Sequence, residues 1–184
     1  RLPALHWKLR KDIPHGAGLG GGSGNAAGAL CLLEHWVGPP GADAQQLLRL
    51  AMSLGSDVPF FLQAQGLAEL RGGRGELRLA SAPAPVAACV IAVPPFTIST
   101  AAVYGALDAR EDTTASRLRS DPSAHPAATP GPNDLTPAAQ KVEPKLRDWL
   151  RQVQDLAALT MSGSGSAHFA PAPSLAAAQD LAVR

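Results

Sequence analysis

The stretch Pro14-His15-Gly16-Ala17-Gly18-Leu19-Gly20-Gly21-Gly22-Ser23-Gly24-Asn25 decides how the rest of this 184-residue chain is interpreted. Six of the nine residues from 16 to 24 are glycine. A glycine-rich backbone can turn several N–H groups toward one point, at positions where a side chain would block the approach. The N-terminus of a helix that follows adds partial positive charge. We therefore predict that residues 14–24 bind phosphate.

The segments on either side of the glycine run support this prediction. Residues 4–11 alternate loosely between apolar and polar side chains, which predicts a half-exposed strand. Residues 25–36 are rich in alanine and leucine at helical spacing, which predicts a buried helix with small residues facing a close neighbour. A flexible linker is the alternative, but linkers do not usually lie between a patterned strand and a packed helix.

The remaining sequence predicts a mixture of helices and short strands. Asp43 is expected to cap a second helix that ends at Gly55. Ser174 is expected to cap the last helix. Further helices are expected at residues 101–107, from Thr136 onward and again from Pro144. Strands are expected at residues 60–63, 66–71, 76–80, 86–93, 157–161 and 167–170. Pro83 and Pro85 suggest a crossing between two lobes, and the polar, proline-rich residues 108–132 predict a mobile loop.

Composition narrows the class of protein. The net charge is +1 and the Lys and Arg residues are scattered, which argues against a nucleic-acid partner. The longest apolar run, residues 86–93, is much shorter than the ~20 residues that span a bilayer, so no membrane partner is expected. Cys31 and Cys89 lie in apolar surroundings without metal-ligand spacing, which predicts buried, reduced thiols in a cytoplasmic protein.

Two familiar phosphate-binding folds fit the glycine run poorly. A Walker loop ends in Gly-Lys-Ser/Thr, and the run has no such lysine. Gly16, Gly18 and Gly21 match the GxGxxG pattern of dinucleotide-binding folds. That fold needs a second parallel strand after the helix, whereas Pro39-Pro40-Gly41 leads into another helix here. An NAD-binding oxidoreductase is therefore the weaker alternative.

Four segments, taken in order, resemble the motifs of the GHMP kinases. They are Pro14 to Ser23, Gly55-Ser56-Asp57-Val58-Pro59-Phe60-Phe61 with Gly73-Arg74-Gly75-Glu76, Pro132-Asn133-Asp134-Leu135, and Met161-Ser162-Gly163-Ser164-Gly165-Ser166. The triple-glycine form is similar to that of the members acting on 4-diphosphocytidyl-2-C-methyl-D-erythritol, in non-mevalonate isoprenoid biosynthesis. The resemblance runs from about Lys11 to Phe169.

This resemblance implies a two-lobed α+β fold, present here only in part. An ATP-binding lobe of the kind also found in a small-subunit ribosomal protein would occupy residues 1–83, and a ferredoxin-like substrate lobe residues 84–184. The implied reaction is ATP-dependent phosphorylation of the 2-hydroxyl of the cytidine diphosphate-linked methylerythritol. Mg²⁺ would assist the transfer. The alternatives are a GHMP kinase for mevalonate, homoserine or a sugar, and a nucleotide-binding remnant without catalysis.

The resemblance also implies roles for individual residues. By itself, Asp57 is more often a turn cap or a solvated carboxylate, but the matching aspartate of the family faces the attacking hydroxyl. Ser164 and Gly165 would offer backbone N–H groups to the substrate, unless residues 162–166 are an ordinary hairpin turn. Thr100 matches a substrate-side position, and Tyr104 an aromatic that stacks on cytosine; a core or surface tyrosine is the alternative.

The sequence departs from the family pattern in two places. The family pairs its aspartate with a lysine from a Pro-Ala-Lys strand, and this sequence has no such motif. We therefore expect that the first strands, and closing structure after Arg184, are absent from this chain. Gly24 replaces a second serine, which leaves Ser23 as the candidate hydroxyl ligand for Mg²⁺.

Overall fold

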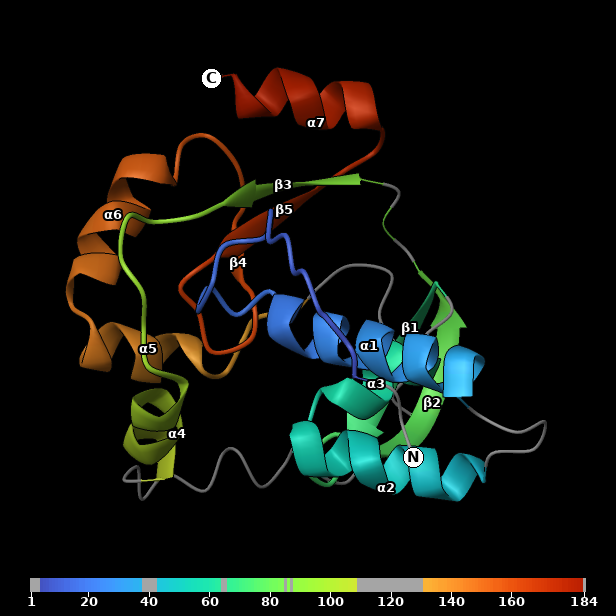
Figure 1. Ribbon diagram of the computed structural model, residues 1–184. Helices are drawn as coiled ribbons and strands as arrows, with labels where there is room; N and C mark the ends of the chain where they lie inside the picture. The colour runs from blue at the N-terminus through green and yellow to red at the C-terminus, as the bar shows by residue number, and fades with distance from the viewer. Residues whose placement is uncertain are drawn as a thin grey trace.

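A computed structural model describes residues 4–37, 43–63, 66–84, 86, 88–108 and 131–183. It has the predicted α+β composition (Figure 1). The helices are α1 (Gly21–Val37), α2 (Ala44–Leu54), α3 (Val58–Gln63), α4 (Thr100–Asp108), α5 (Thr136–Val142), α6 (Lys145–Val153) and α7 (Leu175–Ala182). The strands are β1 (Leu67–Gly72), β2 (Leu77–Pro83), β3 (Ala88–Ala92), β4 (Thr160–Met161) and β5 (His168–Ala172).

Helices α1, α2 and α3 pack together around a small apolar core. Its buried members are Ala27, Leu30, Ala51 and Val58. The predicted ends of α2 are confirmed, because the Asp43 carboxylate accepts a hydrogen bond from the N–H of Gln45 at 2.9 Å and the Gly55 N–H donates to Ala51 O at 3.2 Å. These caps fix where α2 stops, and α3 starts within a few residues of that point.

Strands β1 and β2 form an antiparallel hairpin beside these helices. Leu70 pairs with Ala80 and Arg71 with Arg78, so Leu79 is an extra residue on β2. Such a bulge bends the strand and changes where its neighbours point. As a result, Arg71 and Arg78 lie directly opposite each other.

The remaining strands form a three-stranded antiparallel sheet in the order β3-β5-β4. Helices α4, α5 and α6 connect β3 to β4, and β5 then lies between these two parallel strands. This is the split arrangement of a ferredoxin-like unit, as predicted. The second apolar core lies under these helices and includes Val103, Ala139, Leu146 and Met161.

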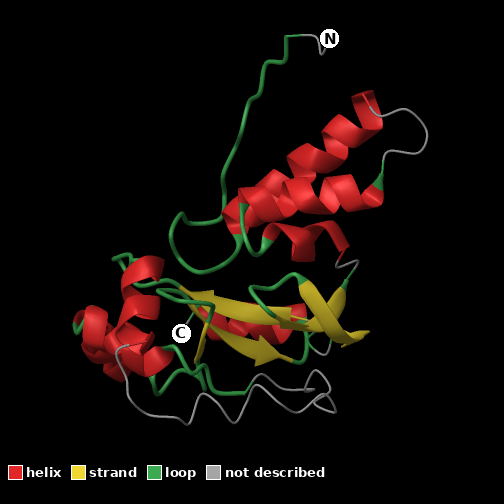
Figure 2. Cartoon of the chain, turned by 90° about the horizontal axis from the view of Figure 1, so that it is seen from below, coloured by secondary structure: helices red, strands yellow, loops and turns green. Residues whose placement is uncertain are grey.

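Two predicted strands are not strands. Residues 4–11 pair with no other strand among the described residues, and they run away from the body of the molecule (Figure 2). Alternation of side chains favours a strand only when a sheet edge is available to bond it. Residues 60–63 belong to α3, because Val58 and Pro59 begin a helix whose Val58 joins the α1–α2 core. The apolar run there was too short for its period to be recognised.

The prediction of buried cysteines is wrong for both residues. Cys31 and Cys89 are exposed. Helix α1 buries one face only, and Trp36 on it is 72% exposed. Cys89 lies on the outward face of β3, whose side chains alternate between partly buried and exposed. The expected buried helix at residues 25–36 is therefore buried on one side only, with Ala27 and Leu30 in the core and Trp36 exposed.

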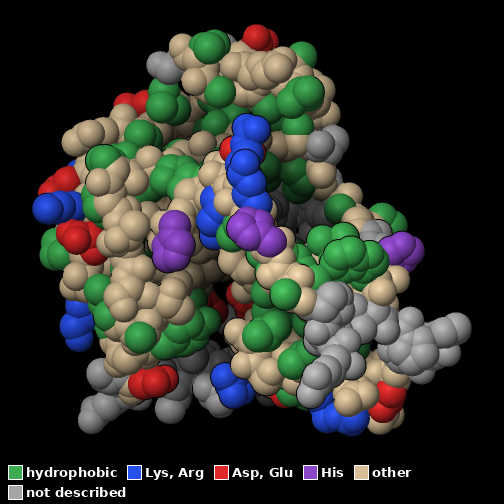
Figure 3. Space-filling model, in the orientation of Figure 1, with side chains coloured by type: hydrophobic (Ala, Val, Ile, Leu, Met, Phe, Trp, Pro, Cys, Tyr) green, Lys and Arg blue, Asp and Glu red, His purple; other side chains and the backbone are tan. Residues whose placement is uncertain are grey.

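The outer surface is mixed in character. On the face in Figure 3, Lys and Arg side chains form one short column near the centre, next to histidines, and hydrophobic side chains lie in several separate groups. No helix in the described ranges is both long and apolar enough to cross a membrane. The predicted loop at residues 108–132 lies almost entirely outside the described residues, as do Pro39, Pro40, Gly41 and Pro85.

Candidate active site

The glycine run folds as a loop that only glycine can form easily. Gly16, Gly18 and Gly20 have φ angles of 70°, 74° and 66°. This left-handed conformation costs other L-residues roughly 1–2 kcal/mol each. The alternating glycines are therefore required by the backbone, which turns at every second residue before α1 begins.

Gly18 makes the closest approach. A β-carbon there would collide with Ser162 O and would lie 2.8 Å from Gly165 O. The Ser162 hydroxyl donates a hydrogen bond to Gly18 O at 2.9 Å, and the Ala167 N–H donates to Ala17 O at 3.0 Å. The first and last predicted motifs, more than 140 residues apart in sequence, are thus in direct contact.

The loop leads into the N-terminus of α1, which begins beside the β4–β5 connection and runs away from it (Figure 1). The first hydrogen bond of the helical kind joins the Gly24 N–H to Gly20 O at 2.9 Å. The N–H groups of Gly21, Gly22 and Ser23 therefore have no acceptor within α1, because a helical N–H bonds to the carbonyl four residues earlier. Free amides at a helix N-terminus bind anions, and phosphate in particular.

Residues 162–166 form a hairpin turn that contacts the glycine loop. The Ser162 N–H donates to Ala167 O at 2.9 Å, which closes the turn between β4 and β5. The Asn133 side chain holds the turn from outside, donating to Met161 O at 2.8 Å and Gly163 O at 2.7 Å. The turn is therefore held from two sides, by Asn133 and by the glycine loop.

A third contact joins this turn to α4. The hydroxyls of Ser164 and Thr100 share a hydrogen bond of 2.8 Å, although the two residues are 64 positions apart. Tyr104 lies one turn further along α4 and is 50% exposed. Thr100, Ser164 and Gly165 are thus brought together, whereas Tyr104 takes no part in these contacts.

Asp57 shares a cavity with the glycine loop. The cavity has a volume of about 330 Å³, and its lining includes Gly18, Leu19, Gly20, Ser56 and Asp57. The Asp57 side chain is exposed, and it accepts a long hydrogen bond of 3.4 Å from the Ser56 hydroxyl. Its carboxylate is therefore free to meet a ligand held by the loop. Pro14 and His15 are exposed and do not line this cavity.

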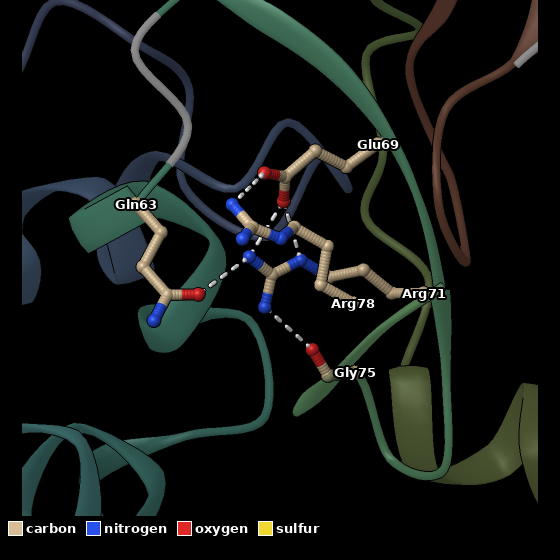
Figure 4. Close-up of polar contacts among 5 residues, drawn as sticks. All are labelled: Gln63, Glu69, Arg71, Gly75 and Arg78. Carbon is tan, nitrogen blue, oxygen red and sulfur yellow. Dashed lines mark hydrogen bonds and ion pairs between the residues drawn. The ribbon is translucent and has the colours of Figure 1, made fainter. Parts of the chain in front are cut away.

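Six lining residues had no individual role predicted from the sequence: Ser56, Phe60, Phe61, Glu69, Arg71 and Gly75. Phe61 lies under the loop, so that a β-carbon at Gly20 would be 2.7 Å from its ring. Glu69 and Arg71 alternate along β1 and form a buried ion pair (Figure 4). Opposite charges two residues apart in a strand could have indicated this pair, but the sequence alone does not say which face of β1 is covered.

Neither Lys8 nor Lys11 lies at the cavity, and both are exposed on the N-terminal segment. Within the described residues, the cation that lines the cavity is Arg71. No group of three or more His, Cys, Asp or Glu side chains among the described residues could hold a metal ion.

Comparisons with known proteins agree with this geometry. Residues 2–65, which contain the glycine loop and Asp57, match the GHMP kinases N terminal domain. The chain is thus similar to the GHMP kinases. A crystal structure of 4-(cytidine 5'-diphospho)-2C-methyl-D-erythritol kinase superposes with a TM-score of 0.64 at 32% identity, over 94% of this chain and 63% of that structure.

Two curated relatives bear the same enzyme name, 4-diphosphocytidyl-2-C-methyl-D-erythritol kinase. The protein from Nitrosomonas europaea is 36% identical over 94% of this chain and 60% of its own length. The protein from Polaromonas naphthalenivorans is 40% identical over 90% of this chain and 56% of its own length. The predicted resemblance is thus confirmed, for a chain that spans less than two thirds of the length of these relatives.

Proposed function

We propose that this chain is part of a GHMP kinase and takes part in ATP-dependent phosphorylation of the 2-hydroxyl of 4-diphosphocytidyl-2-C-methyl-D-erythritol, in the cytoplasm. The observation that carries the proposal is the cavity shared by Asp57 and the glycine loop. A phosphate held at the loop and a hydroxyl near Asp57 would be close enough to react. Positioning and charge stabilisation provide most of the catalysis in phosphoryl transfer. The names of the relatives support the choice of substrate.

The phosphates of ATP would be bound by residues 14–24. The amides of Gly21, Gly22 and Ser23 at the start of α1 offer hydrogen bonds to anionic oxygens. Mg²⁺, when bound, would offset the charge that develops on the transferred phosphoryl group. We assign to the Ser23 hydroxyl a role as a ligand of that ion.

Asp57 would act on the acceptor. Its carboxylate can accept the proton of the attacking hydroxyl, or orient that oxygen toward the γ-phosphate. The exposed position of Asp57 and its single long internal hydrogen bond support this role, because the carboxylate is not committed to the fold. The reaction leaves ADP and the 2-phosphate of the substrate.

The acceptor would extend toward the turn between β4 and β5. Ser164 and Gly165 would contact the substrate, with Thr100 beside them and Tyr104 offering a ring face to the cytosine. We also propose a division into two lobes, residues 1–83 and 84–184. The two separate sheets support this boundary, since β1 and β2 fall before it and β3, β4 and β5 after it.

Substitution of Asp57 by Ala tests the proposal. We expect phosphate transfer to be abolished while the Kd for ATP changes little, because the loop amides do not depend on this side chain. Turnover by coupled ADP release and binding by calorimetry would be measured in parallel. Asp180→Ala, an exposed position on α7, is the matched control and should retain wild-type turnover. Activity of Asp57→Ala within about tenfold of wild type would refute the assignment of Asp57.

Competition by a cytidine nucleotide separates this function from the alternatives. A GHMP kinase for mevalonate, homoserine or a sugar needs no cytosine pocket, so cytidine monophosphate should not inhibit it. ATP binding without any turnover would support a non-catalytic remnant instead. Binding of a nicotinamide dinucleotide in place of ATP would support the oxidoreductase alternative.

A further inference from the structure

The Arg71 guanidinium lines the cavity and is the centre of a buried polar network (Figure 4). Its side chain is 9% exposed, and the carboxylate of Glu69 beside it is fully buried. Arg71 Nε donates to Glu69 Oε2 at 2.7 Å, and Nη2 lies 2.5 Å from the same oxygen. An ion pair this far from solvent is held in one geometry when its other donors are also satisfied.

The remaining donors of Arg71 reach two other segments. Nη1 donates to Gly75 O, in the turn between β1 and β2, at 2.9 Å. Nη2 also donates to Gln63 Oε1, at the end of α3, at 3.1 Å. The guanidinium lies 5.5 Å from the centre of the Phe60 ring, also on α3. One side chain therefore ties β1, the β1–β2 turn and α3 together.

Both of the segments that Arg71 holds border the turn that carries Asp57. Helix α3 begins at Val58, directly after Asp57. Gly75 lies against that turn from the other side, so that a β-carbon on Gly75 would be only 3.0 Å from Ser56 O. The Asp57 side chain itself has only the long contact with Ser56, so its position depends on how its backbone is held.

We propose that Arg71 is a positioning residue for Asp57: through Gly75 and α3 it fixes the Ser56–Asp57 turn at the cavity. The proposal deepens the proposed function and rests on the role given there to Asp57. A guanidinium has five N–H donors, and the contacts with Glu69, Gln63 and Gly75 occupy four of them, so Arg71 is bound chiefly to the fold and keeps at most one donor for a ligand.

Substitution of Arg71 by Lys tests this role, since lysine keeps the charge and loses the planar fork. We expect kcat to fall about tenfold to a hundredfold with the KM for ATP within about threefold, because a small misplacement of a catalytic group has effects of this size. Amide hydrogen exchange at residues 56–58 should become about tenfold faster, in the range expected for a loosened turn.

Arg78→Lys is the matched control. Arg78 also pairs with Glu69, at 3.8 Å, but its side chain is 55% exposed. This variant should stay within about threefold of wild type in kcat and in exchange at residues 56–58, as expected for an exposed ion pair. Unchanged exchange at residues 56–58 in Arg71→Lys, or a raised KM for ATP with kcat retained, would overturn the proposal.

Gly75→Ala provides a second test, which serves even if Arg71→Lys fails to fold. Gly75 has a φ angle of 112°, and the added β-carbon presses on Ser56 O while the ion pair with Glu69 stays intact. We expect the same loss of kcat and the same local exchange, and normal turnover would overturn the proposal. If the wild-type chain shows no turnover, the proposed function fails, while hydrogen exchange at residues 56–58 still decides whether Arg71 positions the turn.

Discussion

At the scale of single residues, the fold of the glycine loop depends most on Gly18. Its neighbours leave no room for a side chain, because Ser162 O and Gly165 O lie where a β-carbon would be. Its φ angle of 74° adds strain for any other residue. The Gly18 carbonyl also accepts a hydrogen bond from the Ser162 hydroxyl. Gly18 is thus constrained by both backbone conformation and packing.

Gly18→Ala should therefore weaken both stability and nucleotide binding. The left-handed backbone alone costs about 1–2 kcal/mol, and the collision with Ser162 O forces the loop away from the β4–β5 turn. We expect the Kd for ATP to rise at least about tenfold, since a loop displaced by that strain no longer presents its amides together. Calorimetric titration with ATP and thermal unfolding would measure the two effects.

Gly22→Ala is the internal control for this substitution. No atom lies within 4 Å of a β-carbon at Gly22, and the residue is in the first turn of α1. Alanine in place of a helical glycine should stabilise the chain by roughly 0.5–1 kcal/mol with little change in ATP binding. Equal effects of the two substitutions would show that the loop is not held as described.

At the scale of elements, local chemistry determined what the sequence could predict. The caps at Asp43, Gly55 and Ser174 were predicted correctly, because a cap depends on hydrogen bonds to residues nearby in sequence. The strand at residues 4–11 was predicted wrongly, because a strand also needs a partner that alternation does not supply. Residues 60–63 were mistaken for a strand because a run of three apolar residues fits either period.

In the candidate site too, features set by local chemistry could be predicted from the sequence, and features set by packing could not. The glycine loop and the turn at residues 162–166 could be found from their residues, since each needs glycine for a local reason. The pairing of Glu69 with Arg71 depends on which face of β1 is buried against α3. That burial is decided by packing between elements, and it leaves no local pattern. The exposure of Cys31 and Cys89 was missed for the same reason.

His168 on β5 predicts how stability depends on pH. Its ring lies 5.5 Å from that of Trp149 on α6, and Nδ1 donates a hydrogen bond to Ser166 O at 3.0 Å. Burial lowers the pKa of His168 below its ordinary value, and the bond to Ser166 O offsets this only in part. The unfolded chain therefore binds a proton more readily than the folded one at acidic pH, so stability should fall as pH drops from about 7 toward 5.

His168→Asn should flatten this dependence, because asparagine can donate to Ser166 O and does not titrate. The midpoint of urea unfolding, measured at several pH values between about 5 and 8, would show it. His35→Asn is the control, since His35 is exposed near the end of α1 and should keep the wild-type slope. A wild-type slope in His168→Asn would mean that other groups cause the loss of stability in acid.

At the scale of the whole molecule, the glycine loop connects two separately packed halves. Helices α1, α2 and α3 have one apolar core, and α4, α5 and α6 have another. The hydrogen bonds from Ser162 Oγ to Gly18 O and from Ala167 N to Ala17 O join the loop before α1 to the sheet of the second half. The site that would bind ATP is therefore built where two separately packed halves meet.

This arrangement predicts that the two halves open together. In native-state hydrogen exchange under increasing urea, the most protected amides of α1 and of β5 should report the same free energy and the same urea dependence. Gly18→Ala should separate the two, because it forces apart the loop and the β4–β5 turn while leaving each apolar core intact. In Gly22→Ala, the amides of α1 and of β5 should still report the same opening free energy. If α1 and β5 already open at different free energies in the wild-type chain, contacts at the loop do not couple the halves, and the site would have to be assembled by its ligand.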